Sequence, residues 1–285
     1  MKVRRSVLYM PAANSRALEK AAGFDADALI FDLEDAVAPD SKPIAREQAV
    51  AAVRSGSYGH RELTIRCNGL DTPWGTDDVA AASAAGPSAI VIPKVASAAH
   101  VDEITAVMDR AAASSNVKVW AMIETPDGIV NADEIAAHPR VDCFVMGTND
   151  MAKELRAQLI PGRVPLVPHL ASALLAARRH GISALDGVFN DVKDAVGFED
   201  ECVQGWQMGF DGKTLIHPAQ LEPCNRVWSP TADDVGYARR VIEAFTEAQA
   251  EGRGVCTVDG RMIENLHVDN ARLVLAVHDV IAART

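Results

Sequence analysis

The sequence predicts a (β/α)8 TIM barrel with a C-terminal helical extension. Short apolar runs alternate with longer amphipathic segments along the chain. There are eight such runs, and each is followed by a helix-like segment or by a loop that leads to one. The run 89–92 (AIVI) is apolar at every position, as expected of a parallel strand that is buried on both faces. A doubly wound sheet is the alternative, because hydrophobic periodicity does not show whether a sheet closes.

The predicted strands are short and apolar, whereas the segments between them place apolar residues three or four positions apart, as on the buried face of a helix. The strands are Ser6–Met10, Ala28–Asp32, Leu63–Arg66, Ala89–Pro93, Lys118–Ile123, Cys143–Gly147, Ser183–Asp186 and Lys213–His217. The helices are Ser15–Ala22, Lys42–Val53, Asp77–Ala84, Ala98–Ala112, Asn131–Ala137, Asp150–Ala157 with Pro168–His180, and Asp194–Met208.

The chain after the eighth predicted strand carries a different pattern. Pro223 and Pro230 indicate a boundary there, because proline interrupts both helices and strands. We therefore expect a barrel domain over residues 1–228 and a helical extension over residues 229–285, which we expect to contact a neighbouring subunit. The extension contains predicted helices near Ala232–Ala250 and Val268–Ala283, joined by the short stretch Gly254–Met262.

The composition excludes several classes of function. The chain has 28 Lys and Arg residues against 39 Asp and Glu, a formal net charge of −11, so it lacks the basic surface that a nucleic-acid backbone requires. Its five cysteines have no C-x-x-C spacing, which favours reduced thiols in a cytoplasmic protein. The basic start 1–5 does not predict a signal peptide, since the apolar run behind it stops at Pro11. No run approaches about 18 apolar residues, so we expect no membrane partner.

Charged and polar side chains follow the predicted strands at their carboxyl ends. They are Asp32, Glu34, Asp35, Arg66, Asn68, Lys94, Glu124, Asp150, Asp186 and His217. In a barrel these ends meet at one face, which carries the active site. Any one of these side chains could instead cap a helix or form a surface ion pair, and we expect His217 to order a turn before Pro218. The set as a whole predicts a catalytic face.

Glu124 and Asp150 are the most informative pair. They lie at the ends of consecutive strands, which are about 5 Å apart in a barrel. Two carboxylates at that distance repel each other unless a cation or a proton lies between them. The chain has no HExxH motif, and no cluster of His or Cys accompanies the pair, so zinc is disfavoured. One or two carboxylates completed by water and substrate are typical of Mg²⁺. The alternative is that both residues only cap helices, which could begin near Thr125 and Thr148.

Four basic residues could bind an anionic substrate. Arg66 and Lys94 lie on the two strands before the carboxylate pair, and the planar guanidinium of Arg66 suits a carboxylate. Arg16 and Lys20 are four residues apart on a helix after the first strand, which suits a phosphate, although the sequence alone slightly favours a solvated helix face. The segment 209–214 (GFDGKT) is not a P-loop, because its two glycines are too close together, and no G-x-S-x-G motif is present.

Six motifs, in order over nearly the whole chain, resemble the HpcH/HpaI aldolase and citrate-lyase-β superfamily. They are Arg5–Pro11 (RSVLYMP), Asp32–Val37 (DLEDAV), Arg66–Gly69 (RCNG), Pro93–Val95 (PKV), Ile123–Pro126 (IETP) and Gly212–Pro218 (GKTLIHP). Within the superfamily the chain is similar to CoA-ester enzymes of the malyl-CoA lyase and (3S)-malyl-CoA thioesterase type. Met146–Leu155 and Met262–His267 resemble the thioesterase-like branch in particular.

The resemblance implies a Mg²⁺-dependent barrel, with Mn²⁺ as an alternative metal, that forms a homo-oligomer, a trimer or a hexamer. Glu124 and Asp150 match the direct metal ligands, and Glu124 also belongs to the substrate site. Asp32, Glu34 and Asp35 match side chains that hold metal-bound waters.

The resemblance also implies that CoA lies across the strand ends. Arg66 matches a catalytic arginine that holds the carboxylate and carbonyl of the substrate, and Arg16 and Lys20 fall near positions that contact CoA phosphates. The family's tail carries an aspartate that enters a neighbouring subunit's site. The matching residue here is Glu264, one methylene longer, which we expect to act as the general base.

The activity that we expect from this resemblance is hydrolysis of (S)-malyl-CoA to malate and CoA. One alternative is a lyase that cleaves malyl-, β-methylmalyl- or citramalyl-CoA into acetyl- or propionyl-CoA and a 2-oxo acid. A second is a citrate lyase β subunit that acts on an acyl-carrier thioester. A third is a catalytically silent scaffold, which the presence of both Glu124 and Asp150 disfavours.

Overall fold

Eight parallel strands close into a barrel in the order in which they occur along the chain. They are β1 Ser6–Pro11, β2 Ala28–Asp32, β3 Glu62–Arg66, β4 Ala89–Ile92, β5 Lys118–Ile123, β6 Val141–Met146, β7 Ser183–Asp186 and β8 Gly212–Leu215. The barrel closes because β1 pairs with β8, from Ser6 opposite Lys213 to Leu8 opposite Leu215. The predicted TIM barrel is confirmed, and the closure excludes the doubly wound alternative.

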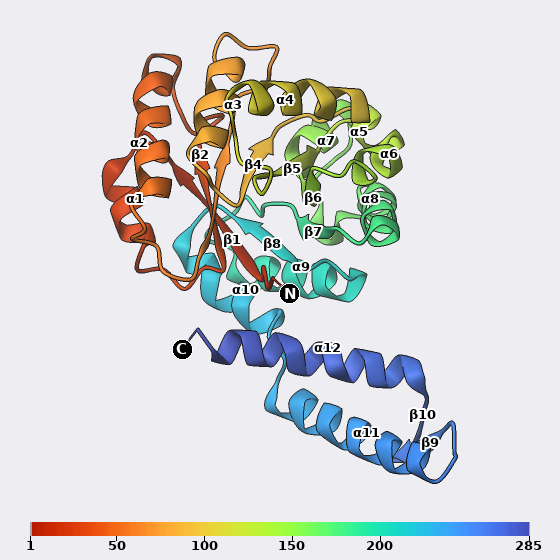
Figure 1. Ribbon diagram of the computed structural model, residues 1–285. Helices are drawn as coiled ribbons and strands as arrows, with labels where there is room; N and C mark the ends of the chain where they lie inside the picture. The colour runs from red at the N-terminus through yellow and green to blue at the C-terminus, as the bar shows by residue number, and fades with distance from the viewer. Residues whose placement is uncertain (1, 285) are drawn as a thin grey trace. The chain divides into compact units, whose positions relative to one another are not determined.

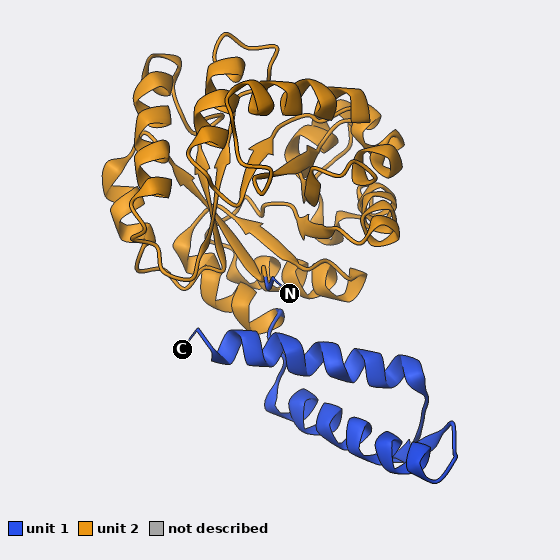
Figure 2. Ribbon diagram, viewed as in Figure 1, with its two compact units in different colours: residues 1–3, 228–285 blue, residues 4–227 orange. Residues whose placement is uncertain are grey.

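This computed structural model describes residues 2–284. It divides into a barrel unit, residues 4–227, and a C-terminal unit, residues 228–285 with 1–3 (Figure 2). The division falls between Val227 and Trp228, one residue before the boundary expected from the sequence.

Helices surround the strands of the barrel (Figure 1). They are α1 Ser15–Ala21, α2 Lys42–Arg54, α3 Gly75–Ala84, α4 Ala98–Arg110, α5 Pro126–Val130, α6 Ala132–Ala136, α7 Thr148–Leu155, α8 Val167–His180, α9 Ala195–Met208 and α10 Leu221–Val227, with 3₁₀ turns at η1 Pro39–Ser41, η2 Pro161–Arg163 and η3 Pro218–Gln220. Helix α10 lies where the prolines predicted only a turn-rich boundary. It forms because Pro223 is in its first turn, where a missing N–H leaves no helical hydrogen bond unmade.

Alternate side chains of the strands fill the barrel interior, which explains why the strands are uniformly apolar. The interior cluster consists of Val7, Ala28, Ile30, Ala89, Val91, Trp120, Met122, Cys143, Val145 and Leu185. Trp120 is the largest fully buried side chain.

At the amino ends of the strands, charged side chains form ion pairs. Arg4 lies 2.7 Å from Glu62 and 2.6 Å from Asp142, and its guanidinium carbon lies 4.7 Å from the centre of the Trp120 ring. These contacts tie the start of β1 to the starts of β3 and β6. They lie at the end of the barrel that contributes to stability in TIM-barrel proteins, away from the carboxyl ends.

The C-terminal unit consists of α11 Ala232–Ala250, β9 Cys256–Val258, β10 Arg261–Ile263 and α12 Asn265–Ala282. The stretch Gly254–Met262, for which we predicted no regular structure, contains most of the antiparallel hairpin of β9 and β10. The hairpin forms because Asp259 and Gly260 both have positive φ and make the tight turn that Asp-Gly favours. Helix α12 begins at Asn265, three residues earlier than predicted. None of the described helices combines the length and the apolar character needed to cross a membrane.

Candidate active site

A cavity of about 350 Å³ opens at the carboxyl ends of the barrel strands. Its lining consists of Tyr9, Pro11, Asp32, Asp35, Ala36, Arg66, Met122, Glu124, Met146, Gly147, Thr148, Asn149, Asp150, Val188, Asn190, Thr214 and Ile216. Five of the sequence-predicted residues are among them, namely Asp32, Asp35, Arg66, Glu124 and Asp150. The barrel therefore brings half of the ten predicted strand-end residues into the lining of one cavity.

Carboxylates surround the guanidinium of Arg66. Its Nε and Nη2 donate to the two oxygens of Asp32, at 2.6 and 2.7 Å, and its Nη1 lies 2.8 Å from Glu34. The Tyr9 ring stacks against the same group, with the guanidinium carbon 4.8 Å from the ring centre. Asp32 also accepts from the backbone N–H groups of Glu34 and Ala36. Three of the five N–H groups of Arg66 are thus held by carboxylates, which fixes the plane of the guanidinium.

Burial raises the pKa of Glu34 to about 7, although Arg66 acts in the opposite direction. Asp35, by contrast, has a side chain that is 75% exposed, at 3.6 Å from Arg66.

Glu124 is buried at the end of β5, where its Oε1 accepts from the backbone N–H of Lys94 at 2.8 Å. Lys94 has a φ of 51°, in the left-handed region, and in this conformation its backbone N–H points to Glu124. Gly147 faces the same carboxylate so closely that a Cβ there would lie 2.2 Å from Oε2 of Glu124. The end of β6 can therefore pass Glu124 only because residue 147 is glycine.

The electrostatics of Glu124 and Asp150 fit a shared cation. Burial raises the pKa of Glu124 to about 7, and the charge of Asp150, in the first turn of α7, adds to the rise against the Lys94 N–H and Arg66. Within residues 2–284, no three His, Cys, Asp or Glu side chains are arranged to hold a metal by themselves. Two carboxylates and open positions for water and substrate match the way in which Mg²⁺ is bound in proteins.

Sequence reasoning missed the buried Lys42, which supports the loop after β2. Its Nζ donates to the carbonyl oxygens of Leu33 and Glu34 and to Oδ1 of Asn68, at 2.7–2.8 Å. The loop therefore presents Asp32, Glu34 and Asp35 in a fixed arrangement. Only the position of Lys42 just after this acidic loop could have indicated the role, because a lysine in a first helical turn is ordinarily exposed.

Arg16 and Lys20 line a neighbouring cavity of about 370 Å³ on the β1–β8 side of the barrel. This cavity shares Tyr9, Pro11 and Ile216 with the first one, so the two are adjacent. Asn14 caps α1 by accepting from the backbone N–H of Ala17. The basic pair is thus held beside the carboxylate site.

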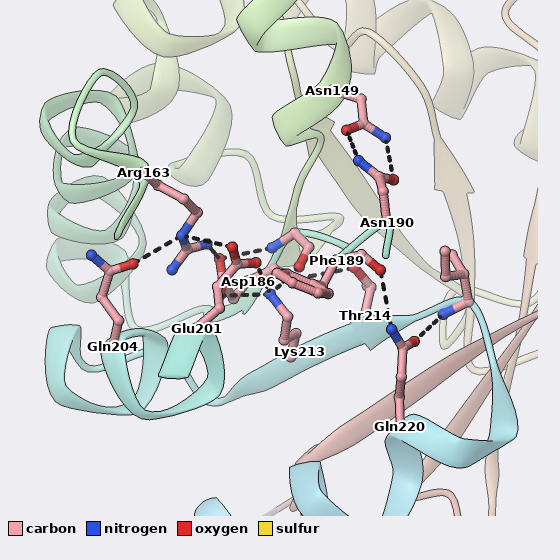
Figure 3. Close-up of polar contacts among 12 residues, drawn as sticks. Asn149, Arg163, Asp186, Phe189, Asn190, Glu201, Gln204, Lys213, Thr214 and Gln220 are labelled. Carbon is pink, nitrogen blue, oxygen red and sulfur yellow. Dashed lines mark hydrogen bonds and ion pairs between the residues drawn. The ribbon is translucent and has the colours of Figure 1, made fainter. Parts of the chain in front are cut away.

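Two expected members of the catalytic face are wrong. Asn68 does not line the first cavity, because its side-chain amide bonds with Lys42, the carbonyl of Leu33 and Asp78. Asp186, at the end of β7, does not line the first cavity but forms a buried ion cluster with Arg163 at 2.6 Å and Lys213 at 3.1 Å (Figure 3). Its carboxylate faces the outer layer of the barrel because the preceding Leu185 faces the interior, and on that outer side Glu201 of α9 contacts the same Lys213. His217 caps η3, with Nδ1 accepting from the backbone N–H of Ala219, so its predicted role in a turn is confirmed.

Glu264 lies in the C-terminal unit, half-buried just before α12. Its backbone N–H donates to Nδ1 of His267 at 3.2 Å, which caps the helix. Its predicted role as a base stays a prediction.

The HpcH/HpaI aldolase/citrate lyase family pattern matches residues 5–218 of this chain. The chain belongs to the HpcH/HpaI aldolase/citrate lyase family. Individual relatives extend the match to nearly the full length of the chain. A (3S)-malyl-CoA thioesterase from Cereibacter sphaeroides is 50% identical over 279 residues, which cover 98% of this chain and 96% of the relative. The citrate lyase subunit beta of Escherichia coli is 37% identical, covering 96% of this chain and 93% of the relative.

Solved structures of similar proteins share the architecture. CitE from Mycobacterium tuberculosis, in complex with magnesium, acetoacetate and coenzyme A, has a TM-score of 0.78 and 28% identity, covering 97% of this chain and 98% of that one. RipC from Yersinia pestis has a TM-score of 0.68 and 32% identity, covering 81% of this chain and 98% of that one. This member of the HpcH/HpaI family thus has the family barrel, with both predicted metal-binding carboxylates, Glu124 and Asp150, in the first cavity, which is called the main cavity below.

Proposed function

We propose that this chain is a Mg²⁺-dependent enzyme that hydrolyses (S)-malyl-CoA to malate and CoA. The observation that carries the proposal is the meeting of Glu124, Asp150 and Arg66 in one cavity, adjacent to the cavity of Arg16 and Lys20. The first cavity offers Glu124 and Asp150 to chelate a metal and Arg66 to bind a substrate carboxylate. The cavity of Arg16 and Lys20 offers positive charge for phosphates. The 50% identity to (3S)-malyl-CoA thioesterase supports the choice of acyl group.

Glu124 and Asp150 would hold the metal, and magnesium in the complexes of the related CitE supports this choice over Mn²⁺. The ion supplies a positive charge that polarises the bound acyl group. Asp35 is exposed at the rim and is best suited to hold a metal-bound water, because both oxygens of Asp32 accept from Arg66. Asp32 and Glu34 act mainly by orienting Arg66.

Arg66 binds the malyl carboxylate. Asp32 and Glu34 occupy three of its N–H groups, and the two others are available to a substrate anion. Arg16 and Lys20 bind CoA phosphates, so the thioester runs from their cavity past Tyr9 and Ile216 towards Glu124.

Hydrolysis needs a base. The base takes a proton from water while the water oxygen bonds to the thioester carbonyl carbon; the C–S bond then breaks, and the CoA thiolate leaves and takes up a proton. We assign the base to Glu264, on the resemblance of the tail to the thioesterase branch.

The assembly that we propose is a cytoplasmic homo-oligomer, a trimer or a hexamer, whose C-terminal extension contacts a neighbouring subunit. All five cysteines are free thiols, as expected in a reducing compartment. Light scattering after gel filtration measures the oligomeric state, and a monomer would contradict this part of the proposal.

C–C cleavage is the second candidate, because the chain also matches citrate lyase beta subunits over nearly its whole length. Cleavage would remove the proton of the malyl hydroxyl and break the bond between the carbinol carbon and the carbon next to the thioester carbonyl. The electron pair of that bond passes to a thioester enolate, which takes up a proton to give acetyl-CoA, and the carbinol carbon becomes the carbonyl of glyoxylate.

Product analysis separates the two reactions. The protein is incubated with (S)-malyl-CoA and Mg²⁺, and free thiol, malate, acetyl-CoA and glyoxylate are measured. Thiol and malate in equal amounts support hydrolysis, whereas acetyl-CoA with glyoxylate supports the lyase. Absence of all four products, in a protein shown to be folded, contradicts both.

A further inference from the structure

A second cavity of about 510 Å³ lies beside the main cavity, on the β6–β7 side of the barrel. It shares Thr148, Asn149, Val188 and Asn190 with the main cavity. It shares none of the described residues that line the cavity of Arg16 and Lys20. The three cavities therefore form a row, with the carboxylate site in the middle.

The four shared residues form the partition between the main and second cavities. At its rim, the side chains of Asn149 and Asn190 face each other and exchange two hydrogen bonds, of 3.1 and 2.7 Å (Figure 3). Asn149 comes from the first turn of α7, and Asn190 from the loop after β7. The paired amides thus bridge the carboxyl ends of two neighbouring strands.

The loop that carries Asn190 is anchored along its length. Its first residue, Gly187, donates to Oδ1 of Asp186 at 2.8 Å and accepts from the buried Nζ of Lys213. Its third residue, Phe189, accepts from Nε2 of Gln220 at 3.0 Å (Figure 3). The partition is therefore a built part of the barrel end, and only its exposed amide pair can be removed without disturbing these anchors.

The lining of the second cavity favours an alkyl group. Val188, Phe189, Leu159, Ile160 and Pro161 supply apolar surface. Two members of the buried ion cluster, Arg163 and Glu201, line the cavity and lie 3.4 Å apart, so their charges oppose each other. The remaining charged lining consists of Asp191, Asp194 and Asp200. An anion would meet these three carboxylates, whereas a hydrocarbon substituent would bury apolar surface.

We propose that the Asn149–Asn190 pair determines acyl-group specificity, by closing the acyl cavity against substituents on the carbon next to the thioester carbonyl. Removing the pair joins the two cavities and admits longer substituents. This inference rests on the proposed function, since it takes the main cavity as the acyl site.

The test compares the wild type with Asn190→Ala on malyl-CoA that carries hydrogen, methyl or propyl at that carbon. The readout is the ratio of kcat/KM for the propyl substrate to kcat/KM for the unsubstituted one. Each methylene buried in an apolar site is worth about fourfold, so three carbons raise the ratio roughly 60-fold in N190A. Leu159→Trp in the N190A background fills the second cavity and is expected to reverse the gain.

Asn131→Ala is the matched control, because it also removes a side-chain amide at the same end of the barrel. The amide of Asn131 donates to the carbonyl of Ala96, and Asn131 lines neither cavity. A ratio in N190A within twofold of the wild type, or an equal rise in N131A, overturns the proposal. If the wild type does not turn over malyl-CoA, the proposed function fails by itself. In that case calorimetry with Mg²⁺ measures how the wild type and N190A bind 3-propylmalate and malate. The proposal holds if N190A binds 3-propylmalate more tightly relative to malate than the wild type does, and it is overturned if the two proteins show the same ratio.

Discussion

Substitution of Gly147 by alanine tests whether the position of Glu124 controls activity. An added Cβ would lie 2.2 Å from Oε2 and 2.3 Å from Cβ of Glu124, whereas ordinary contact begins near 3.4 Å. The carboxylate must therefore move by about 1.2 Å, or the end of β6 must move instead. Gly147 has a φ of −97°, which alanine also adopts, so the damage comes from the contact and not from the backbone.

A misplacement of about 1 Å in a reacting constellation costs roughly 100-fold in rate, or about 2.7 kcal/mol in the barrier. We expect Gly147→Ala to lower kcat/KM for malyl-CoA by at least that factor and to weaken Mg²⁺ binding. The measurements are steady-state kinetics over a range of Mg²⁺ and calorimetric titration of the metal. Gly254→Ala is the control, since a Cβ at Gly254 meets nothing within 4 Å. If G147A is as active as G254A at every Mg²⁺ concentration, the geometric reasoning is refuted.

Three further predictions follow from the site. Because burial raises the pKa of Glu124 to about 7, from 4.5, the folded protein binds more protons than the unfolded chain between these values. Metal-free protein should lose stability as the pH rises from 4.5 through 7, by about 3 kcal/mol at most, and Mg²⁺ should restore it. Thermal unfolding of the wild type and of Glu124→Gln over this pH range checks the prediction. If the melting temperatures of the two proteins change equally with pH, the prediction is wrong. Glu264→Ala should lower hydrolysis by 10²–10⁴-fold, and unchanged hydrolysis and cleavage rates would remove Glu264 from the mechanism. Arg16→Ala with Lys20→Ala should raise KM for malyl-CoA far more than for malyl-pantetheine, which lacks the nucleotide phosphates; equal effects on both would exclude CoA binding at this pair.

The sequence predicts the barrel well because its signals are local. Apolar runs mark strands, and polar residues directly after them mark the catalytic face, which is why Glu124, Asp150 and Arg66 are found in one cavity. Asp186 obeys the same rule but turns outward to Lys213, because successive side chains of a strand point to opposite faces and Leu185 before it faces the barrel interior.

Other features depend on contacts between distant segments, which no local pattern records. Lys42 resembles an exposed helix residue until the loop after β2 covers it. The need for glycine at position 147 appears only once β5 and β6 lie side by side. The Asn149–Asn190 pair joins residues 41 positions apart, in segments whose composition is that of ordinary loops.

The double ion pair of Arg4 has a consequence for the order of events during synthesis. Its partners are 58 and 138 positions further along the chain, so the first strand leaves the ribosome long before either carboxylate exists. Strand β1 pairs with β2 on one edge and with β8 on the other, and β8 is made later still. The nascent amino-terminal half can therefore complete the ion pairs of Arg4, but its sheet keeps two open edges until β8 is made, so the barrel can close only after translation has passed its last strand.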